Sequence, residues 1–155
     1  MKNNIGLDVE KSKELVNHLN DLLANYQLFY QNLRGFHWNV KGPKFFELHL
    51  KFEELYNDAV IKVDEIAERV LTLGGTPLHT MEDYLSHSEI KSIKSDGIQT
   101  EAVTHVIDNF STLIKKERKI LALAGDADDE GTNSLMSDYI TESEKVVWML
   151  SSFMS

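Results

Sequence analysis

The strongest constraint in this sequence is the helical spacing of its apolar residues, which continues over four long segments with few interruptions. The 155 residues include only 2 Pro and 8 Gly, so few positions break a helix. Within each segment, apolar side chains recur every three or four residues, the spacing that places them on one face of an α-helix. No segment alternates apolar and polar residues as a half-buried strand does. The pattern predicts an all-α protein.

Short breaks separate the segments. Asp8 is a good N-cap, Gly42 is followed by Pro43, and Gly74 and Gly125 are expected to end helices. We therefore predict long helices over about residues 9–40, 43–73, 98–124 and 132–153, and a short helix at 81–86. Four amphipathic helices with one long connection, between the second and the third, predict a four-helix bundle. At this length the prediction is a single domain over residues 1–155.

Composition excludes several classes of protein. The count of Cys is 0, which rules out disulfide frameworks, thiolate nucleophiles and iron–sulfur clusters. Lys and Arg number 16 and Asp and Glu 25, a net charge of -9, so the basic footprint of a nucleic-acid-binding protein is missing and cationic partners such as metal ions are favoured. The start of the chain does not resemble a signal peptide, and no apolar run approaches the ~18 residues that span a bilayer. The simplest expected location is the cytoplasm, with no membrane partner.

Four metal-binding side chains share one flank of the second predicted helix. At ~100° per residue, His49, Glu53, Asp64 and Glu68 fall in one band ~100° wide beside the apolar stripe. They form two pairs with i,i+4 spacing, and each pair can converge on one ion because such residues are neighbours on a helix surface. The pairs are 15 residues apart from His49 to Asp64, or ~22 Å of helix. One helix therefore cannot bring both pairs to one ion.

Three interpretations of this band compete. It can be a solvated charged face, the ordinary role of charged residues on a helix. It can belong to a di-iron site inside the bundle, but the Glu-x-x-His motif of such sites does not occur in the chain. It can also be two half-sites that a second subunit completes. A two-fold axis between antiparallel copies of the helix would bring the His49 end of one copy beside the Asp64 end of the other, twice per dimer.

The residues around this band resemble those of the Dps family of miniferritins. The resemblance extends from about Val9 to Phe153, and its most specific block lies between His37 and Glu68. The stretches that carry it are Phe36-His37-Trp38-Asn39-Val40-Lys41-Gly42-Pro43, Phe45-Phe46-Glu47-Leu48-His49, Phe52-Glu53-Glu54-Leu55-Tyr56, Asp64-Glu65-Ile66-Ala67-Glu68-Arg69, Gly74-Gly75-Thr76-Pro77 and Trp148-Met149-Leu150.

The resemblance implies a ferritin-like bundle that assembles into a hollow homododecamer with ferroxidase sites at its two-fold interfaces. By motif match, His37 and His49 of one subunit would act with Asp64 and Glu68 of the partner subunit. Glu53 would be a further iron ligand, at a position where the family often has Asp. Imidazole and carboxylate are suitable ligands for iron. The implied reaction is oxidation of Fe(II), commonly by hydrogen peroxide and otherwise by dioxygen, followed by storage of Fe(III) mineral.

Protection of DNA is the alternative function that the resemblance suggests. Many relatives bind DNA through a tail rich in Lys and Arg, whereas Lys2 is the only basic residue among the first seven here and the last six contain none. Because phosphate contacts need clustered cations, we expect DNA binding to be absent or weak. Trp38, next to a predicted ligand, is expected either to cover the iron site or to be an ordinary interface or core aromatic.

Overall fold

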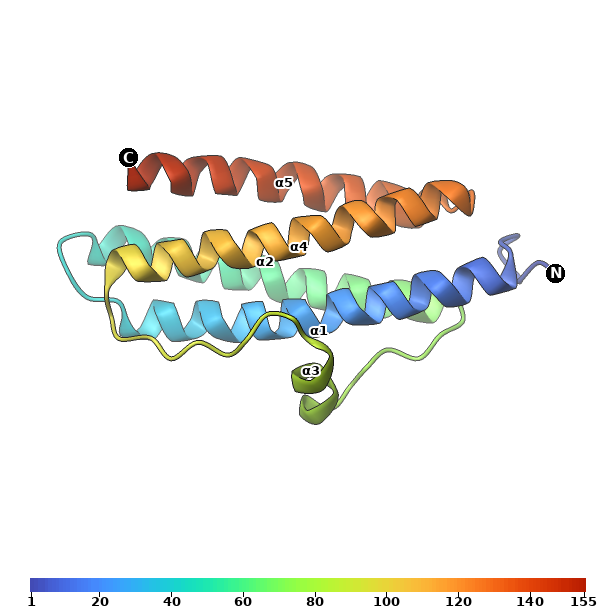
Figure 1. The fold of residues 1–155 in the computed structure, drawn as a ribbon, viewed down its shortest axis with the longest axis horizontal. Helices are drawn as coiled ribbons and strands as arrows, with labels where there is room; N and C mark the ends of the chain where they lie inside the picture. Colours follow the sequence, from blue (N-terminus) through green and yellow to red (C-terminus); the bar gives the residue numbers. More distant parts are fainter.

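The computed structural model describes residues 1–155 as four long helices and one short helix, as the sequence predicts. Figure 1 shows the long helices packed side by side, with the short one outside the bundle. The helices are α1 (Val9–Asn39), α2 (Phe45–Thr72), α3 (Met81–His87), α4 (Gln99–Asp126) and α5 (Glu130–Met154). The all-α, four-helix prediction and the short helix in the second connection are confirmed. No helix combines the length and the hydropathy needed to cross a membrane.

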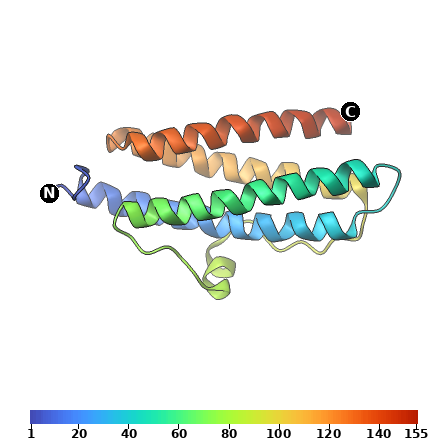
Figure 2. The ribbon, with the colours of Figure 1, turned by 180° about the vertical axis from the view of Figure 1, so that it is seen from behind.

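The connections determine how the helices run. Short loops make α1 and α2 one antiparallel pair and α4 and α5 another (Figure 1). The long segment 73–98, which carries α3, crosses the length of the bundle, so that α2 and α4 run in the same direction (Figure 2). One long crossover in a four-helix bundle is the connectivity of ferritin-like folds.

Two buried asparagines of α1 hold this crossover against the bundle. The side-chain oxygen of Asn25 accepts hydrogen bonds from the backbone N–H groups of Glu89 and Ile90, at 3.1 and 3.0 Å. About two turns further on, the amide of Asn32 donates to the backbone oxygen of Lys91 at 2.9 Å. These bonds satisfy backbone groups of a segment that has no helix or strand of its own there.

The helix ends differ from the prediction at two places. The second helix begins at Phe45 rather than Pro43, after a turn in which Gly42 adopts a φ of 129°. The third long segment, predicted to end before Gly125, does not stop there: α4 continues to Asp126, and the left-handed turn comes at Asp128, with a φ of 56°. A glycine weakens a helix by only about 1 kcal/mol. The next helix then starts early, at Glu130, because the Asp129 side chain caps it by accepting from the Thr132 N–H.

Two charged side chains lie inside the bundle at positions that the helical pattern did not identify. The predicted stripes of the four helices meet in one cluster that includes Leu19, Phe52 and Leu113. Lys62 of α2 and Glu117 of α4 are also buried, at 4 % and 0 % exposed. The helical spacing of the sequence already indicates that such a residue is buried, since Glu117 stands between Leu113 and Ile120 at helical intervals.

Candidate metal centre

The end of α1 and the start of α2 bring two predicted ligands into direct contact. The rings of His37 and His49 stack with their centroids 3.8 Å apart and 14° between their planes. His37 Nδ1 lies 2.7 Å from the backbone oxygen of His49, and His49 Nδ1 lies 2.8 Å from the backbone oxygen of His37. The two histidines are therefore held by a reciprocal pair of hydrogen bonds between neighbouring helices.

These hydrogen bonds decide which nitrogen of each ring is free. A carbonyl oxygen only accepts, so each Nδ1 must carry the proton and donate it. In a neutral imidazole the other nitrogen, Nε2, then keeps its lone pair. Metal-binding histidines are commonly oriented in this way, with one nitrogen on a backbone carbonyl and the other on the metal. His37 and His49 thus present two Nε2 atoms that are prepared to bind a cation.

Three side chains of α2 surround the histidine pair. Phe45 stacks on His49 with centroids 4.9 Å apart, and Tyr56 meets His37 edge to face at 5.3 Å. Glu53 Oε1 lies 3.8 Å from His37 Nε2, close enough for both atoms to reach one ion. His37 itself is only 6 % exposed. Aromatic packing therefore limits the movement of the imidazoles while the carboxylate of Glu53 stays at the surface.

Asp64 and Glu68 form a second group further along the same helix. Both are exposed, and neither forms an ion pair with a cationic side chain of the chain. A hydrogen bond from Glu68 to Asp64, together with the negative charge of Asp64, raises the pKa of Glu68. Two neighbouring carboxyl groups that lack a cation are a suitable half-site for a metal ion.

One chain does not bring the two groups together. His49 and Asp64 are 15 residues apart on the continuous helix α2, which corresponds to ~22 Å. No group of three or more His, Asp or Glu side chains within the chain is arranged to hold a metal ion. The structure thus brings together His37, His49 and Glu53 on one side and Asp64 and Glu68 on the other, and leaves each group incomplete.

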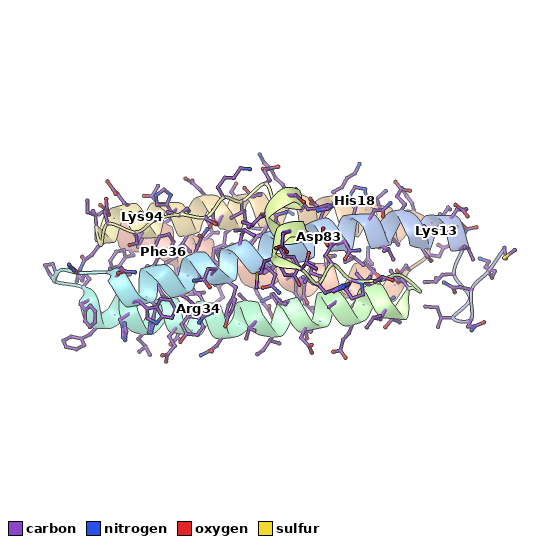
Figure 3. The ribbon with its side chains drawn as sticks, turned by 90° about the horizontal axis from the view of Figure 1, so that it is seen from below. Lys13, His18, Arg34, Phe36, Asp83 and Lys94 are labelled. Atoms are coloured by element: carbon purple, nitrogen blue, oxygen red, sulfur yellow. The ribbon has the colours of Figure 1, made fainter.

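Trp38 lies outside the core, so the expectation of a core aromatic is wrong, and its role at the site or at an interface stays a prediction. It is 57 % exposed, and the guanidinium of Arg34 lies over its ring, 4.9 Å from the centroid, and over the Tyr30 ring at 5.2 Å. Arg34 and Phe36 extend from opposite sides of α1 (Figure 3), and Phe36 stacks on His105 of α4. Trp38 therefore stays on the outer surface, beside the ligand His37.

Known proteins are similar to this chain in both fold and sequence. The ferritin-like domain family matches residues 16–155. A DNA protection during starvation protein of Porphyromonas gingivalis is 41% identical over 148 residues, which cover 96% of this chain and 93% of that protein. The crystal structure of a Dps protein from Vibrio cholerae, described as a ferritin-like diiron-carboxylate protein, has 51% identity and a TM-score of 0.97 over 99% of this chain and 97% of its own. A Dps structure from Bacillus brevis has 38% identity and a TM-score of 0.91 over 94% of this chain and 98% of its own.

The family match extends over residues 16–155, from within α1 to the end of α5. This chain belongs to the Dps family of ferritin-like proteins.

Proposed function

We propose that this protein is a miniferritin that oxidises Fe(II), with hydrogen peroxide as the main oxidant, and stores the Fe(III) product as mineral inside a hollow cage of twelve copies. The observation that carries the proposal is the pair of incomplete half-sites on one flank of α2. His37 and His49 present free Nε2 atoms, whereas Asp64 and Glu68 present carboxylates with no cation.

Each half-site supplies what the other lacks. Two copies of α2 running antiparallel across a two-fold axis would place His37, His49 and Glu53 of one subunit opposite Asp64 and Glu68 of the partner subunit. Because the symmetry repeats the arrangement, each dimer would hold two such sites. Neutral imidazoles and carboxylates together suit iron, which accepts nitrogen and oxygen ligands. Iron is the substrate here, and an incomplete coordination sphere leaves room for the oxidant.

Exposed apolar side chains on α2 support an interface on this helix. Phe46, Leu50 and Ile61 are 81 %, 56 % and 59 % exposed in the single chain. Apolar groups of this size on a helix that also carries half-sites are typical of a surface that another subunit covers. Light scattering should give a closed assembly of about twelve copies at micromolar protein, and a monomer would contradict the cage.

Mixing two inactive variants tests the shared site directly. His37→Ala/His49→Ala and Asp64→Ala/Glu68→Ala should each lose most ferroxidase activity, because every site then lacks half its ligands. After joint unfolding and reassembly, half the dimers should be mixed, and each mixed dimer should hold one site with all four native ligands. About a quarter of wild-type activity should return if the sites act independently.

Reassembly of each variant alone is the control and should stay inactive. Mass spectrometry must show that mixed dimers have formed. If they form and activity stays at the level of the separate variants, the sites are not shared between subunits.

Protection of DNA is the second candidate function, favoured by the name of the Porphyromonas gingivalis relative. Against it is the net charge of -9. A charge balance of this kind opposes contacts with phosphates.

A further inference from the structure

A buried tyrosine and a buried glutamate form a pair that is not part of the candidate iron site. The hydroxyl group of Tyr26 on α1 donates a hydrogen bond of 2.7 Å to Glu117 Oε2 on α4. Tyr26 is 1 % exposed and Glu117 is 0 % exposed, and the other oxygen of Glu117, Oε1, has no hydrogen-bond partner. A buried polar pair of this kind costs stability relative to well-packed apolar residues, and packing does not explain it.

Aromatic rings connect the candidate iron ligands to this pair. The His37 ring touches Tyr56 with centroids 5.3 Å apart, and Tyr56 touches Tyr30 at 6.0 Å. Tyr26 lies one helical turn before Tyr30 on the same face of α1, about 6 Å along the axis. Electron transfer through protein weakens steeply with distance, so closely spaced rings are efficient intermediate stations. Four of the 5 tyrosines of the chain belong to this group, since Tyr139 also contacts Tyr26 at 6.2 Å.

Tyr26 is the member of this path that combines full burial with a buried proton acceptor. A tyrosine that loses an electron must also release its phenolic proton, and no hydrogen bond accepts the hydroxyl protons of Tyr30 and Tyr56. Tyr139 donates to Glu65, an exposed residue next to the half-site residue Asp64. Burial and the charge of Glu117 raise the pKa of Tyr26 well above its ordinary value, so its proton is present before oxidation. Burial likewise makes the Glu117 carboxylate a stronger base, with a pKa of about 7.

We propose that Tyr26 is an auxiliary electron donor to the ferroxidase site, with Glu117 as the acceptor of its proton. The proposal rests on the proposed function. When peroxide is reduced to two waters, its O–O bond breaks and it takes up two electrons and two protons. A site that holds two Fe(II) supplies both electrons. When only one Fe(II) is bound, that ion supplies one electron and becomes Fe(III), and Tyr26 supplies the other through Tyr30 and Tyr56.

The step balances with the groups named. Tyr26 becomes a neutral phenoxyl radical, its proton moves along the existing hydrogen bond to Glu117 Oε2, and solvent provides the two protons that peroxide takes up. The benefit is chemical, because a site with a single Fe(II) would otherwise reduce peroxide by one electron and release hydroxyl radical. The buried position keeps the oxidised phenol away from other molecules.

The test is electron paramagnetic resonance of the assembled protein, frozen after hydrogen peroxide is added with one Fe(II) per expected site. Absorbance of Fe(III) in the same samples reports iron oxidation separately. We expect a tyrosyl radical signal in the wild type that falls when two Fe(II) per site are supplied. Tyr26→Phe should abolish most of the signal and leave the oxidation of iron supplied at two per site unchanged.

Three further variants separate a redox role from a structural one. Tyr84→Phe is the matched control, because Tyr84 lies on α3 outside the path and donates to a backbone oxygen; it should keep the signal. Tyr56→Phe should lower the signal by interrupting the path. Glu117→Gln keeps the size of the side chain and an oxygen that accepts from Tyr26, but it removes the base, so it should lower the signal as well.

The outcomes distinguish the two claims. Iron oxidation without any tyrosyl signal, or a signal that survives Tyr26→Phe, overturns the inference and leaves the proposed function intact. A signal that Glu117→Gln leaves unchanged overturns the role of Glu117. If iron is not oxidised at all, the proposed function fails and the inference fails with it.

Discussion

His37 and His49 fix each other through crossed hydrogen bonds: the Nδ1 of each ring lies 2.7 or 2.8 Å from the backbone oxygen of the other residue. The backbone oxygen of each residue thus orients the imidazole of the other, and each ring leaves Nε2 as the nitrogen that can bind a cation. The arrangement forms within one chain, before any partner subunit is present. The histidine half-site is therefore organised in advance, whereas the carboxylates of Asp64 and Glu68 stay exposed at the surface.

Replacing His49 by Ala should therefore weaken metal binding beyond the loss of one ligand, because His37 keeps its hydrogen bond to the backbone oxygen of residue 49 but loses the imidazole ring that stacks on it. We expect the affinity of the assembled protein for Co(II), a redox-stable substitute for Fe(II), to fall at least roughly tenfold. Equilibrium dialysis measures it. His87→Ala is the control: the Nδ1 of His87 is also bonded to a backbone oxygen, but on α3, away from the half-sites. Equal losses in both variants would contradict the assignment.

Glu117 should make the protein less stable as the pH rises. Burial raises its pKa from 4.5 to about 7, so the native state holds a proton that the unfolded state has already released between these values. The free energy of unfolding therefore falls by on the order of 3 kcal/mol between about pH 4.5 and about pH 7 because of this group. Above that range its contribution no longer changes with pH. Glu117→Gln removes the effect, because the amide is neutral at every pH.

Thermal unfolding at one protein concentration measures this difference. Glu117→Gln should gain stability relative to the wild type at pH 8 and much less at pH 5. Glu14→Gln, at an exposed position of α1, is the control and should behave as the wild type. A gain at pH 5 as large as that at pH 8 would show that Glu117 does not titrate in this range.

Asp129, at the α4–α5 turn, should contribute strongly to the stability of the folded protein. Its side chain is 1% exposed, lies 2.7 Å from Arg69 Nη2 and caps α5 through the Thr132 N–H. Asp129→Ala leaves the Arg69 charge partly buried without its partner and removes the cap, a loss of roughly 3 kcal/mol. Urea unfolding measures it, with the exposed Asp126→Asn as the control. A loss below roughly 1 kcal/mol would mean that Arg69 finds another partner.

DNA binding should be undetectable by gel shift at about 0.15 M salt. The densest basic cluster is on α4, but Lys116 Nζ lies 2.8 Å from Asp21 and Arg118 Nη2 lies 2.6 Å from Glu144. Lys115 and Lys119 are the remaining basic residues of this cluster that could contact phosphate. They lie beside a 460 Å³ hollow between α1 and α4 that His18 also lines. His18 is on the side of α1 that borders α4 (Figure 3).

A retarded band at that salt concentration would contradict the expectation. Lys115→Glu/Lys119→Glu would then show whether this hollow is the contact. Loss of the band in the variant would assign DNA binding to α4, and its survival would assign it elsewhere.

The sequence by itself determined the helices and the positions of the half-sites, because both depend on local spacing. Apolar residues at intervals of three and four defined four amphipathic helices, and i,i+4 spacing put His49 beside Glu53 and Asp64 beside Glu68. The ~22 Å between the pairs also followed from helix geometry alone. These properties belong to a single helix, and tertiary packing did not change them.

Only the tertiary structure decided what depends on contacts between helices. The packing of α1 on α2 brings the rings of His37 and His49 face to face and aligns each Nδ1 with a carbonyl of the other helix, and helical spacing contains no information about that alignment. The same holds inside the bundle, where Glu117 is buried because Tyr26 of another helix can donate a hydrogen bond to it. A charged residue within an apolar stripe signals an exception, but its partner is determined by which helices pack together.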